Sequence, residues 1–415
     1  MQPNSWRTKA YELDRYRWSL LRERFGRFGA AIRFLRDGLG DALFGGLARF
    51  RLAKDGGGSV GCDFLLLQSA PKVIPLQRKK LLKERLRSRG SSLEETALLE
   101  PRQILAERRL RRPPESVPLR YYGYAAYAEW LVSHYMPSIL LNDRNGSLYS
   151  PFLRLSLNAR RLLLVHLAHA TTVERSRRLG MSDYDYYFLF GQSSLDALSG
   201  RQLRFGSAKV VLAGSHMIDQ SYAVPPAQVD NRVLLVLGVG PDKEKEAGYQ
   251  RSYELIRDWA VAHPYYQVLV KAHPRSKVVF WQDASAQAKN IQVLPATCGL
   301  AEAMSRAGIV INIMSNAVIE AALARRPIIY VNQGPDRDIF DQERFFGRRV
   351  DSLEELTDRV HQIYADHQRS LESASQFASF HLVHGVQGLE RNIDYLCALL
   401  RREEIPHQVL EGTCR

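Results

Sequence analysis

Short apolar runs alternate with helix-like segments twice along this chain, and this repeated alternation most limits the folds it can adopt. Each run spans five to seven residues and is rich in branched aliphatic or aromatic side chains, as strands buried on both faces are. The first set is CDFLLL (62–67), SILLN (138–142), LLLVH (162–166), YYFLF (186–190) and KVVLA (209–213). The second set is RVLLVLG (232–238), YQVLVK (266–271), NIQVLP (290–295), GIVINI (308–313) and PIIYVN (327–332). Because parallel strands need helical crossovers, the pattern predicts two doubly wound α/β sheets.

The segments between these runs set the expected domain boundaries. We expect helices at 75–90, 249–263, 299–307 and 317–326, a helical stretch from 352 to 402, and a polar loop over 91–118. The flexible sequence DGGGS at 55–59 and the proline pair in VPPAQ (224–228) mark breaks. We therefore expect four parts. These are a basic amphipathic helical extension at 1–56, two Rossmann-like domains at 57–223 and 224–385, and a C-terminal helix and tail at 386–415.

The positive charge is concentrated near the N-terminus. The chain of 415 residues has a net charge of +14, yet residues 1–120 hold 26 Lys/Arg and 13 Asp/Glu, so the other residues are nearly neutral. Residues 12–54 carry an apolar stripe from Trp18 to Leu39 at helical spacing, interleaved with arginines. This stripe either packs on the protein or a second chain, or lies on an anionic membrane surface. Glycines within it weaken the helix prediction.

Several classes of protein are excluded by composition. Mean hydropathy is −0.27, and no run of 18 uncharged apolar residues occurs, which argues against an ordinary membrane span. The first 18 residues lack the apolar core of a secretory signal. The four cysteines show no CxxC spacing, so neither a zinc site nor a disulfide framework is expected. A reducing, cytoplasmic location fits this pattern best.

The most informative motif is KAHPRS (271–276), which directly follows a predicted strand. Lys271, His273 and Arg275 can hydrogen-bond a phosphate and neutralise its charge, and Pro274 fixes the turn. Ligands of open α/β sheets bind at this edge, so we expect a phosphate site here. The alternative is a histidine that only caps the turn. His263, in a second His-Pro pair before the strand, is interpreted as a helix stop.

Two further segments follow strands of the second set. In INIMSNAVIEAALARRP, Ser315 or Asn316 can cap the next helix and contact phosphate, and Glu320 one turn later can accept from ribose hydroxyls. In LGVGPDKE (237–244), Gly238 and Gly240 allow the backbone close to a ligand, and Asp242 follows. The alternatives are that Ser315 only caps the helix, that Glu320 lies on a solvated helix face, and that Asp242 lies in a solvated turn. The full GxGxxG pattern is absent, so a dinucleotide site is poorly supported.

The first set of strands carries one candidate for acid–base chemistry. VHLAHATTVE (165–174) places His166 and His169 around a strand end, with Glu174 five residues after His169. Such a group could act as general base on an acceptor hydroxyl, or the histidines could be core residues. No third His, Cys or Asp has metal-ligand spacing, so no metal site is predicted. The aromatic run at 184–190 is interpreted as strand core.

The order of these elements resembles GT-B glycosyltransferases that use cytidine-activated donors. KAHPRS is similar to the His-Pro motif of bacterial capsule polysaccharide proteins, and SNAVIEAALARRP (315–327) is similar to their Ser-x4-Glu segment. VHLAHA followed by YDYYFLFG resembles the acceptor domain of that group, which includes retaining β-Kdo transferases and CDP-glycerol glycerophosphotransferases. Two departures stand out: LGVGPDKE has one clear Asp and no acidic cluster before it, and Val318 replaces a glycine.

The resemblance implies a role for each candidate residue. It implies two facing Rossmann-like domains, with the acceptor bound by the first and the nucleotide sugar by the second. His273 and Ser315 would hold the donor phosphate, and Glu320 would lie on the ribose or phosphate side. Asp242 would be the nucleophile of a retaining transferase.

We therefore expect a glycosyltransferase of bacterial surface polysaccharide assembly. Its donor would be a CMP-sugar such as CMP-Kdo and its acceptor a glycan or a lipid-linked glycan, with no metal or other cofactor required. The cytoplasmic enzyme would sit peripherally on the inner face of the membrane through residues 12–54. One alternative is a CDP-glycerol-type phosphotransferase with His169 as base. The other is a non-catalytic scaffold or nucleic-acid-binding protein. Nucleic acid is not an expected partner, since binding through the basic N-terminus would leave the strand-end motifs unexplained.

Overall fold

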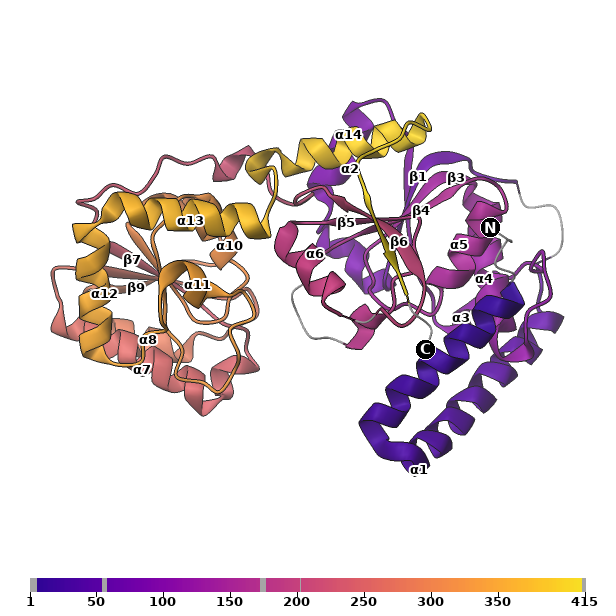
Figure 1. Ribbon diagram of the computed structural model, residues 1–415, viewed down its shortest axis with the longest axis horizontal. Coiled ribbons are helices and arrows are strands. Elements are labelled where there is room, and N and C mark those ends of the chain that lie inside the picture. Colours follow the sequence, from indigo (N-terminus) through magenta and orange to yellow (C-terminus); the bar gives the residue numbers. More distant parts are fainter. Residues whose placement is uncertain (1–5, 54–57, 172–176, 202, 413–415) are drawn as a thin grey trace. The chain divides into compact units, whose positions relative to one another are not determined.

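The computed structural model describes residues 6–53, 58–171, 177–201 and 203–412, which form two compact units. Unit 1 contains residues 6–190, 194–217 and 389–412 of this described part. Unit 2 contains residues 191–193 and 218–388. Both are α/β units built on a mostly parallel sheet, so the predicted fold class is confirmed (Figure 1). The C-terminal segment, expected as a separate tail, belongs to unit 1.

The sheet of unit 1 has the strand order β12-β6-β5-β4-β3-β1-β2. The strands are β1 (Cys62–Gln68), β2 (Leu93–Ala97), β3 (Pro137–Asn142), β4 (Leu163–Leu167), β5 (Tyr186–Leu189), β6 (Ser207–Leu212) and β12 (Gln408–Glu411). β1 to β6 are parallel, while β12 pairs antiparallel with β6. β1 is buried along nearly its whole length because helices cover both faces of a parallel sheet. Neither β2 nor β12 was among the predicted strands.

The order reverses between β1 and β3, which makes this the switch point of the unit 1 sheet. The helices of the unit outside α1 are α2 (Lys80–Ser88), α3 (Pro101–Ala106), α4 (Leu119–Tyr135), α5 (Ser150–Asn158), α6 (Gln192–Ser199, which begins in unit 2) and α14 (Gly388–Leu400), with the 3-10 turns η1 (Pro71–Leu76) and η2 (Arg177–Gly180). α14 buries Leu389, Ile393, Leu396 and Leu399 in the core of the unit. The loop predicted over 91–118 is wrong in part, because β2 and α3 lie within it.

The single amphipathic helix predicted over 12–54 is instead a helical hairpin. The helical segment α1 (Trp6–Phe50) is broken at Gly26, whose φ of 69° lies in the left-handed region that glycine adopts without strain. Arg17 and Asp41 would be about 36 Å apart along a straight helix, yet Nη1 and Oδ2 lie at 2.7 Å. The two arms are therefore antiparallel (Figure 1). The predicted stripe from Trp18 to Leu39 is divided between them.

The second arm of the hairpin packs tightly along α4. A Cβ on Gly45 would lie 1.8 Å from the carbonyl oxygen of Leu119, and one on Gly123 would lie 2.4 Å from the Phe44 ring. These two glycines therefore permit the close approach of the two helices. Ion pairs of Arg120 with Asp14 and Asp41 also join α4 to both arms.

The sheet of unit 2 has the order β11-β10-β7-β8-β9, and all its strands are parallel. The strands are β7 (Val233–Leu237), β8 (Gln267–Lys271), β9 (Ile291–Val293), β10 (Ile309–Asn312) and β11 (Ile328–Tyr330). All five follow the predicted runs. The order reverses between β7 and β10, so the switch point of this sheet lies at those two strands.

The helices of unit 2 enclose this sheet (Figure 1). They are α7 (Ala247–Ala262), α8 (Val279–Gln287), α9 (Leu300–Arg306), α10 (Val318–Leu323), α11 (Gln342–Phe346), α12 (Leu353–Ala365) and α13 (His367–His381), with the 3-10 turns η3 (Gln220–Tyr222), η4 (Lys243–Lys245) and η5 (Gly385–Gln387). Trp259 and Trp281 are fully buried in a core otherwise made mainly of aliphatic side chains. Within the described residues, no helix is both long enough and apolar enough to span a bilayer.

Candidate functional site

A cleft of about 370 Å³ opens at the carboxyl edge of the unit 2 sheet, at its switch point. It is formed by the segments that follow β7, β8 and β10, together with the first residue of α9. Seven residues proposed from the sequence line it. They are Gly238, Gly240, Lys271, His273, Pro274, Ser315 and Asn316. Three segments far apart in the chain thus meet where ligands of open α/β sheets bind.

The backbone fixes the tautomer of His273 in its neutral form. The N–H of Arg275 donates to His273 Nδ1 at 3.2 Å, so Nδ1 must be an acceptor and Nε2 carries the proton. Burial and the neighbouring Arg275 lower the pKa of His273 below its ordinary value, despite the opposing charge of Glu244. At neutral pH the half-buried imidazole therefore offers an N–H donor on Nε2.

Gly238 is needed because two loops touch at this point. Its N–H donates to the carbonyl oxygen of Lys271 at 2.9 Å, and a Cβ would lie 2.9 Å from the amide nitrogen of His273. A side chain there would push the loop after β8 away from β7. Gly240 differs, because a Cβ at that position would meet no atom within 4 Å.

Ser315 and Asn316 lie in the loop between β10 and α10, and the helix begins later than predicted. Ser315 Oγ accepts from the N–H of Ala317 at 3.4 Å, and its own N–H donates to Asn312 Oδ1 at 3.0 Å. α10 begins at Val318 and has only six residues. Its dipole is correspondingly limited, so the polar groups facing the cleft are mainly the Ser315 hydroxyl and the Asn316 amide.

The two cations of KAHPRS lie at different depths. Lys271 is half-buried and lines the cleft, and no ion pair to it occurs among the described residues. Arg275 is exposed and lies outside the lining. Ser276 Oγ donates to Glu244, which ties the loop after β8 to the loop after β7. Lys271 is therefore the positive charge within the cleft itself.

Asp242 and Glu320 are close in sequence to segments that form the cleft, but neither residue lines the cleft. Asp242 is exposed and precedes the turn η4, and its side chain makes no cap hydrogen bond. Its neighbour Lys243 pairs with Asp336 at 2.7 Å, which anchors this loop. Glu320 is half-buried on α10, and burial raises its pKa to about 7. That carboxyl group therefore titrates near neutrality.

The unit 1 sheet places a second polar cluster at its carboxyl edge. His166 is fully buried, and its ring lies 4.3 Å from that of Tyr184 in a stacked arrangement. Its Nδ1 contacts Asn142, and its Nε2 lies 2.8 Å from Asn145 Oδ1. Burial holds its pKa well below the ordinary value. With both ring nitrogens occupied, His166 organises this edge as a core histidine.

His169 lies three residues beyond His166, on the surface. It follows β4 directly and is exposed, so its imidazole is accessible to a substrate. Its charge is close enough to lower the pKa of both His166 and His216. Glu174 lies outside the described residues.

The sequence analysis did not identify three polar residues at this edge of the unit 1 sheet, which are Lys79, Asp143 and His216. Lys79 is 3% exposed and pairs with Asp143, and the two follow β1 and β3 on either side of the switch point. His216 follows β6 and is 1% exposed, and its Nε2 has no hydrogen-bond partner within the described part of the chain. Burial and the nearby Lys79 lower its pKa to about 3. His216 lies three residues after the predicted strand KVVLA, so the strand-end argument applied to His169 could have found it.

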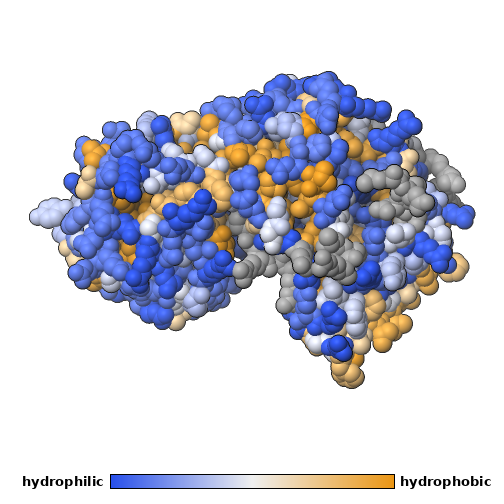
Figure 2. Space-filling model, viewed as in Figure 1, coloured by the Kyte–Doolittle hydropathy of each residue, from blue (hydrophilic) through white to orange (hydrophobic). Residues whose placement is uncertain are grey.

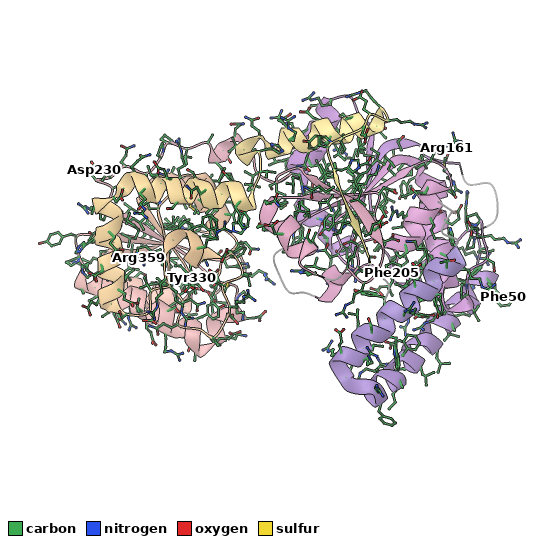
Figure 3. All side chains as sticks on the ribbon, in the orientation of Figure 1. Phe50, Arg161, Phe205, Asp230, Tyr330 and Arg359 are labelled. Atoms are coloured by element: carbon green, nitrogen blue, oxygen red, sulfur yellow. The ribbon has the colours of Figure 1, made fainter. Side chains whose placement is uncertain are left out.

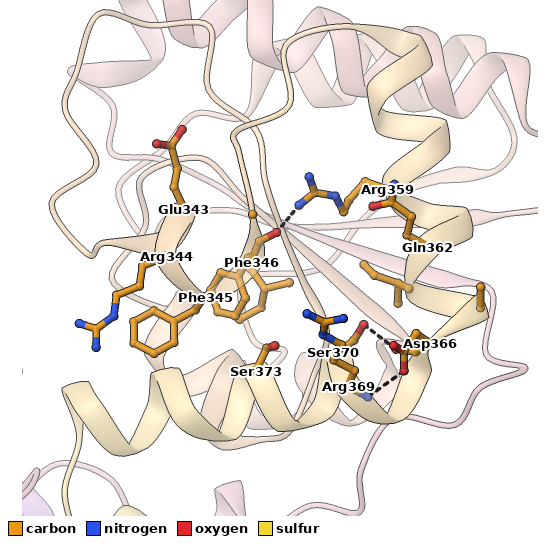
Figure 4. A pocket seen from close by; sticks show the side chains of 14 residues that line it. Glu343, Arg344, Phe345, Phe346, Arg359, Gln362, Asp366, Arg369, Ser370 and Ser373 are labelled. Atoms are coloured by element: carbon orange, nitrogen blue, oxygen red, sulfur yellow. Dashed lines mark hydrogen bonds between the residues drawn. The ribbon is translucent and has the colours of Figure 1, made fainter.

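Unit 2 has another hollow, of about 620 Å³, on a different side of its sheet (Figure 4). Its lining includes Ile328, the first residue of β11, so it lies toward the amino ends of the strands. Arg344, Arg359 and Arg369 border it, but Arg359 is engaged by the carbonyl oxygen of Phe346, and the Arg344 side chain points away from the other two. The arginines do not converge on a common point.

Comparison with known proteins identifies the fold but not a family. No family model matches the chain, and no curated protein matches it. Solved structures do match. A UDP-N-acetylglucosamine 2-epimerase from Listeria monocytogenes has 12% identity and a TM-score of 0.53 over 83% of this chain and 98% of that one.

Two further structures extend this likeness. The Neisseria meningitidis UDP-GlcNAc 2-epimerase, solved with UDP-GlcNAc bound, has 12% identity and a TM-score of 0.52 over 80% of this chain and 99% of that one. The glycotransferase of kitacinnamycin has 14% identity and a TM-score of 0.50 over 82% and 99%. The chain therefore has the GT-B type of fold, with two Rossmann-like units.

Proposed function

We propose that this protein is a glycosyltransferase that uses a nucleotide-activated sugar, and that its nucleotide phosphate binds in the unit 2 cleft. The cleft at the switch point between β7 and β10 carries this proposal. Lys271 supplies a positive charge, and His273 Nε2–H, Ser315 and Asn316 supply hydrogen-bonding groups. This set suits a phosphate whose charge grows as the sugar departs.

The finer proposal is a CMP-sugar donor, such as CMP-Kdo, in bacterial capsule or lipopolysaccharide assembly. It rests on the resemblance of KAHPRS and SNAVIEAALARRP to capsule polysaccharide proteins. In a retaining reaction, an Asp242 carboxylate oxygen attacks the anomeric carbon and CMP leaves with the bonding electron pair. The acceptor hydroxyl then attacks the same carbon and gives up its proton to a general base or to solvent, and the Asp242 carboxylate is released.

Nucleotide binding tests the donor directly. We expect CMP or CDP to raise the melting temperature, while UMP, UDP, GDP and ADP at equal concentration do not, because only a ligand of the folded state stabilises it. Stabilisation by UDP alone would overturn the cytidine proposal and favour the nucleotide found with the structurally similar epimerase of N. meningitidis. A failure of all six nucleotides would count against the cleft as a nucleotide site.

Transfer is tested with two carboxylate variants. Asp242→Asn should abolish sugar transfer and leave nucleotide binding unchanged, since Asp242 is not in the cleft lining. Asp230→Asn, at another exposed loop aspartate of the same unit, is the matched control and should retain transfer (Figure 3). Undiminished transfer by Asp242→Asn would remove the nucleophile from the proposal.

The acceptor is proposed to be a glycan or a lipid-linked glycan, reached from the inner face of the cytoplasmic membrane. A CDP-glycerol-type phosphotransferase with His169 as base is the second candidate, supported by the exposed imidazole at the carboxyl edge of unit 1. The two differ in product, since one transfers a sugar and the other a glycerol phosphate. Phosphorus in the acceptor product, detected by mass spectrometry, would favour the phosphotransferase.

A further inference from the structure

An apolar face of the helical hairpin has no packing partner within the part of the chain that the structure describes. Seven large hydrophobic side chains on its second arm are exposed, at intervals of three or four residues. They are Phe28, Ile32, Leu35, Leu39, Leu43, Leu47 and Phe50. Leu39 is 73% exposed and Phe50 is 87% exposed. Within the described residues, 18 such side chains are exposed, so more than a third of them gather on this one arm.

This exposed stripe lies opposite the face that packs on the protein. The buried residues of the same arm include Ala30, Phe44, Gly45 and Ala48. At about 100° per residue, they centre roughly half a turn away from the stripe. Packing against α4 therefore cannot cover it. Figure 2 shows hydrophobic residues along the outer side of the hairpin, and Figure 3 shows Phe50 at the end of its arm, pointing away from the unit.

Exposed arginines surround this stripe. Residues 6–51 contain eleven Lys/Arg and five Asp/Glu, a net of six positive charges. Arg22, Arg24 and Arg27 lie near the turn at Gly26, and Arg36 and Arg49 lie on the second arm; all five are exposed. Guanidinium groups beside an apolar face suit anionic lipid headgroups above acyl chains.

We propose that residues 28–50 bind the surface of an anionic bilayer, with the seven apolar side chains inserted between headgroups. A second copy of the chain fits this face less well, because joining two hairpins would bring six net positive charges toward six others. Membrane binding would bring the enzyme to the proposed lipid-linked acceptor, and this biological role rests on the proposed function. Its test uses no nucleotide, so it can fail independently of the proposed function.

Cosedimentation of the full-length protein with vesicles tests this proposal. The vesicles contain phosphatidylglycerol and phosphatidylcholine in equal parts, and vesicles of phosphatidylcholine alone are compared. We expect strong binding to the anionic vesicles that high salt reduces without abolishing, because salt screens the arginines and leaves the apolar contact intact. Protein that stays in the supernatant at low salt would overturn the proposal.

Two matched triple variants identify the face. Leu35→Gln/Leu39→Gln/Leu43→Gln should weaken vesicle binding by about tenfold or more, because three side chains that enter the bilayer become polar. Val229→Gln/Val261→Gln/Tyr265→Gln alters three exposed apolar residues of unit 2 and should bind as the native protein does. Equal binding by both variants would overturn the assignment of the face.

The same variants separate a membrane face from a dimer face. All three leucines are exposed, so the variant should keep the native melting temperature and the native mass in size-exclusion chromatography with light scattering. The proposal would be overturned if the native protein were a dimer, the leucine triple variant were a monomer, and neither protein bound vesicles. The face would then be assigned to self-association. Arg24→Gln/Arg27→Gln/Arg36→Gln should reduce the preference for anionic vesicles, and an unchanged preference would contradict the role of these charges.

Discussion

At the scale of single residues, hydrogen bonding to the backbone sets what each side chain in the cleft can offer a ligand. The N–H of Arg275 occupies His273 Nδ1, so Nε2 presents a proton without the imidazole being charged. Lys271 then carries the positive charge of the cleft lining. The hydrogen-bond donor and the positive charge are thus on different residues, and the neutral donor on His273 keeps its function across the physiological pH range.

Replacing His273 should weaken nucleotide binding. A hydrogen bond to a charged phosphate contributes about 1.5–3 kcal/mol, so His273→Ala should raise the Kd by about tenfold or more. His273→Gln, whose amide can still donate, should recover part of this loss. His263→Ala is the control, because His263 stacks on Trp259 at the end of α7, away from the cleft lining. Calorimetric titration measures all three, and equal effects at both histidines would contradict the assignment.

The carboxyl group of Glu320 should make the stability of unit 2 depend on pH. Burial raises its pKa from 4.5 to about 7, so ionising this group in the folded state costs free energy. The cost is nearly absent well below pH 4.5, grows as the pH rises from 4.5 to 7, and reaches about 3 kcal/mol above pH 7. Glu320→Gln should therefore melt close to the native temperature at pH 4 and at a higher temperature at pH 8.

Glu254→Gln, on the exposed face of α7, is the control for that pH series. Compared with the native protein, the melting temperature of this variant should show no gain that grows between pH 4 and pH 8. A Glu320→Gln variant with the same melting temperature as the native protein at pH 8 would show that the buried carboxyl group is stabilised by its surroundings.

At the scale of secondary-structure elements, the hairpin depends on close packing of its second arm against α4. Gly45→Ala should destabilise unit 1 by about 2–3 kcal/mol, because the new methyl would overlap the Leu119 carbonyl, a backbone atom that cannot rotate away. Gly46→Ala is the matched control. Its Cβ would meet nothing within 4 Å, so it should be neutral or stabilise the helix by up to about 1 kcal/mol. Denaturant unfolding distinguishes the two, and similar effects of both would contradict this packing.

At the scale of the whole molecule, unit 1 is completed by the end of the chain. The four α14 side chains Leu389, Ile393, Leu396 and Leu399 are at most 3% exposed in its core. Burial of such a side chain contributes about 1.5–3 kcal/mol, so their sum is comparable with the 5–15 kcal/mol that stabilises a typical domain. Ending the chain at Gly388 should therefore unfold unit 1 and leave nucleotide binding by unit 2.

Hydrogen exchange measured by mass spectrometry checks this prediction segment by segment. In the chain ending at Gly388, protection should fall in β1, β3 and β4 and persist in β7, β8 and β10. Ending the chain at Ile405 keeps all of α14 and removes β12 with the residues beside it; β12 is largely exposed, so protection should be preserved in both sheets. Native protection of β1 without α14 would contradict the dependence of unit 1 on the C-terminal helix.

The sequence alone was sufficient to predict the unit 2 sheet, the strands β1 and β3 to β6 of the unit 1 sheet, and the segments that form the unit 2 cleft. Apolar runs are local signals, and parallel strands place their carboxyl ends at one edge, so Gly238, His273 and Ser315 could be grouped without coordinates. The weakly apolar edge strands β2 and β12 were missed because their pairing depends on neighbours distant in sequence.

Only the tertiary structure could decide where each helix and charge lies. The helical period continues through residues 18–39, but Gly26 reverses the chain, so the predicted stripe is divided into a half-buried part on the first arm and an exposed part on the second. Asp242 falls outside the cleft lining, and Lys79 and His216 join His169 at the edge of unit 1. Burial, pKa and pairing arise from contacts between distant segments, and a linear sequence encodes those contacts only through the fold.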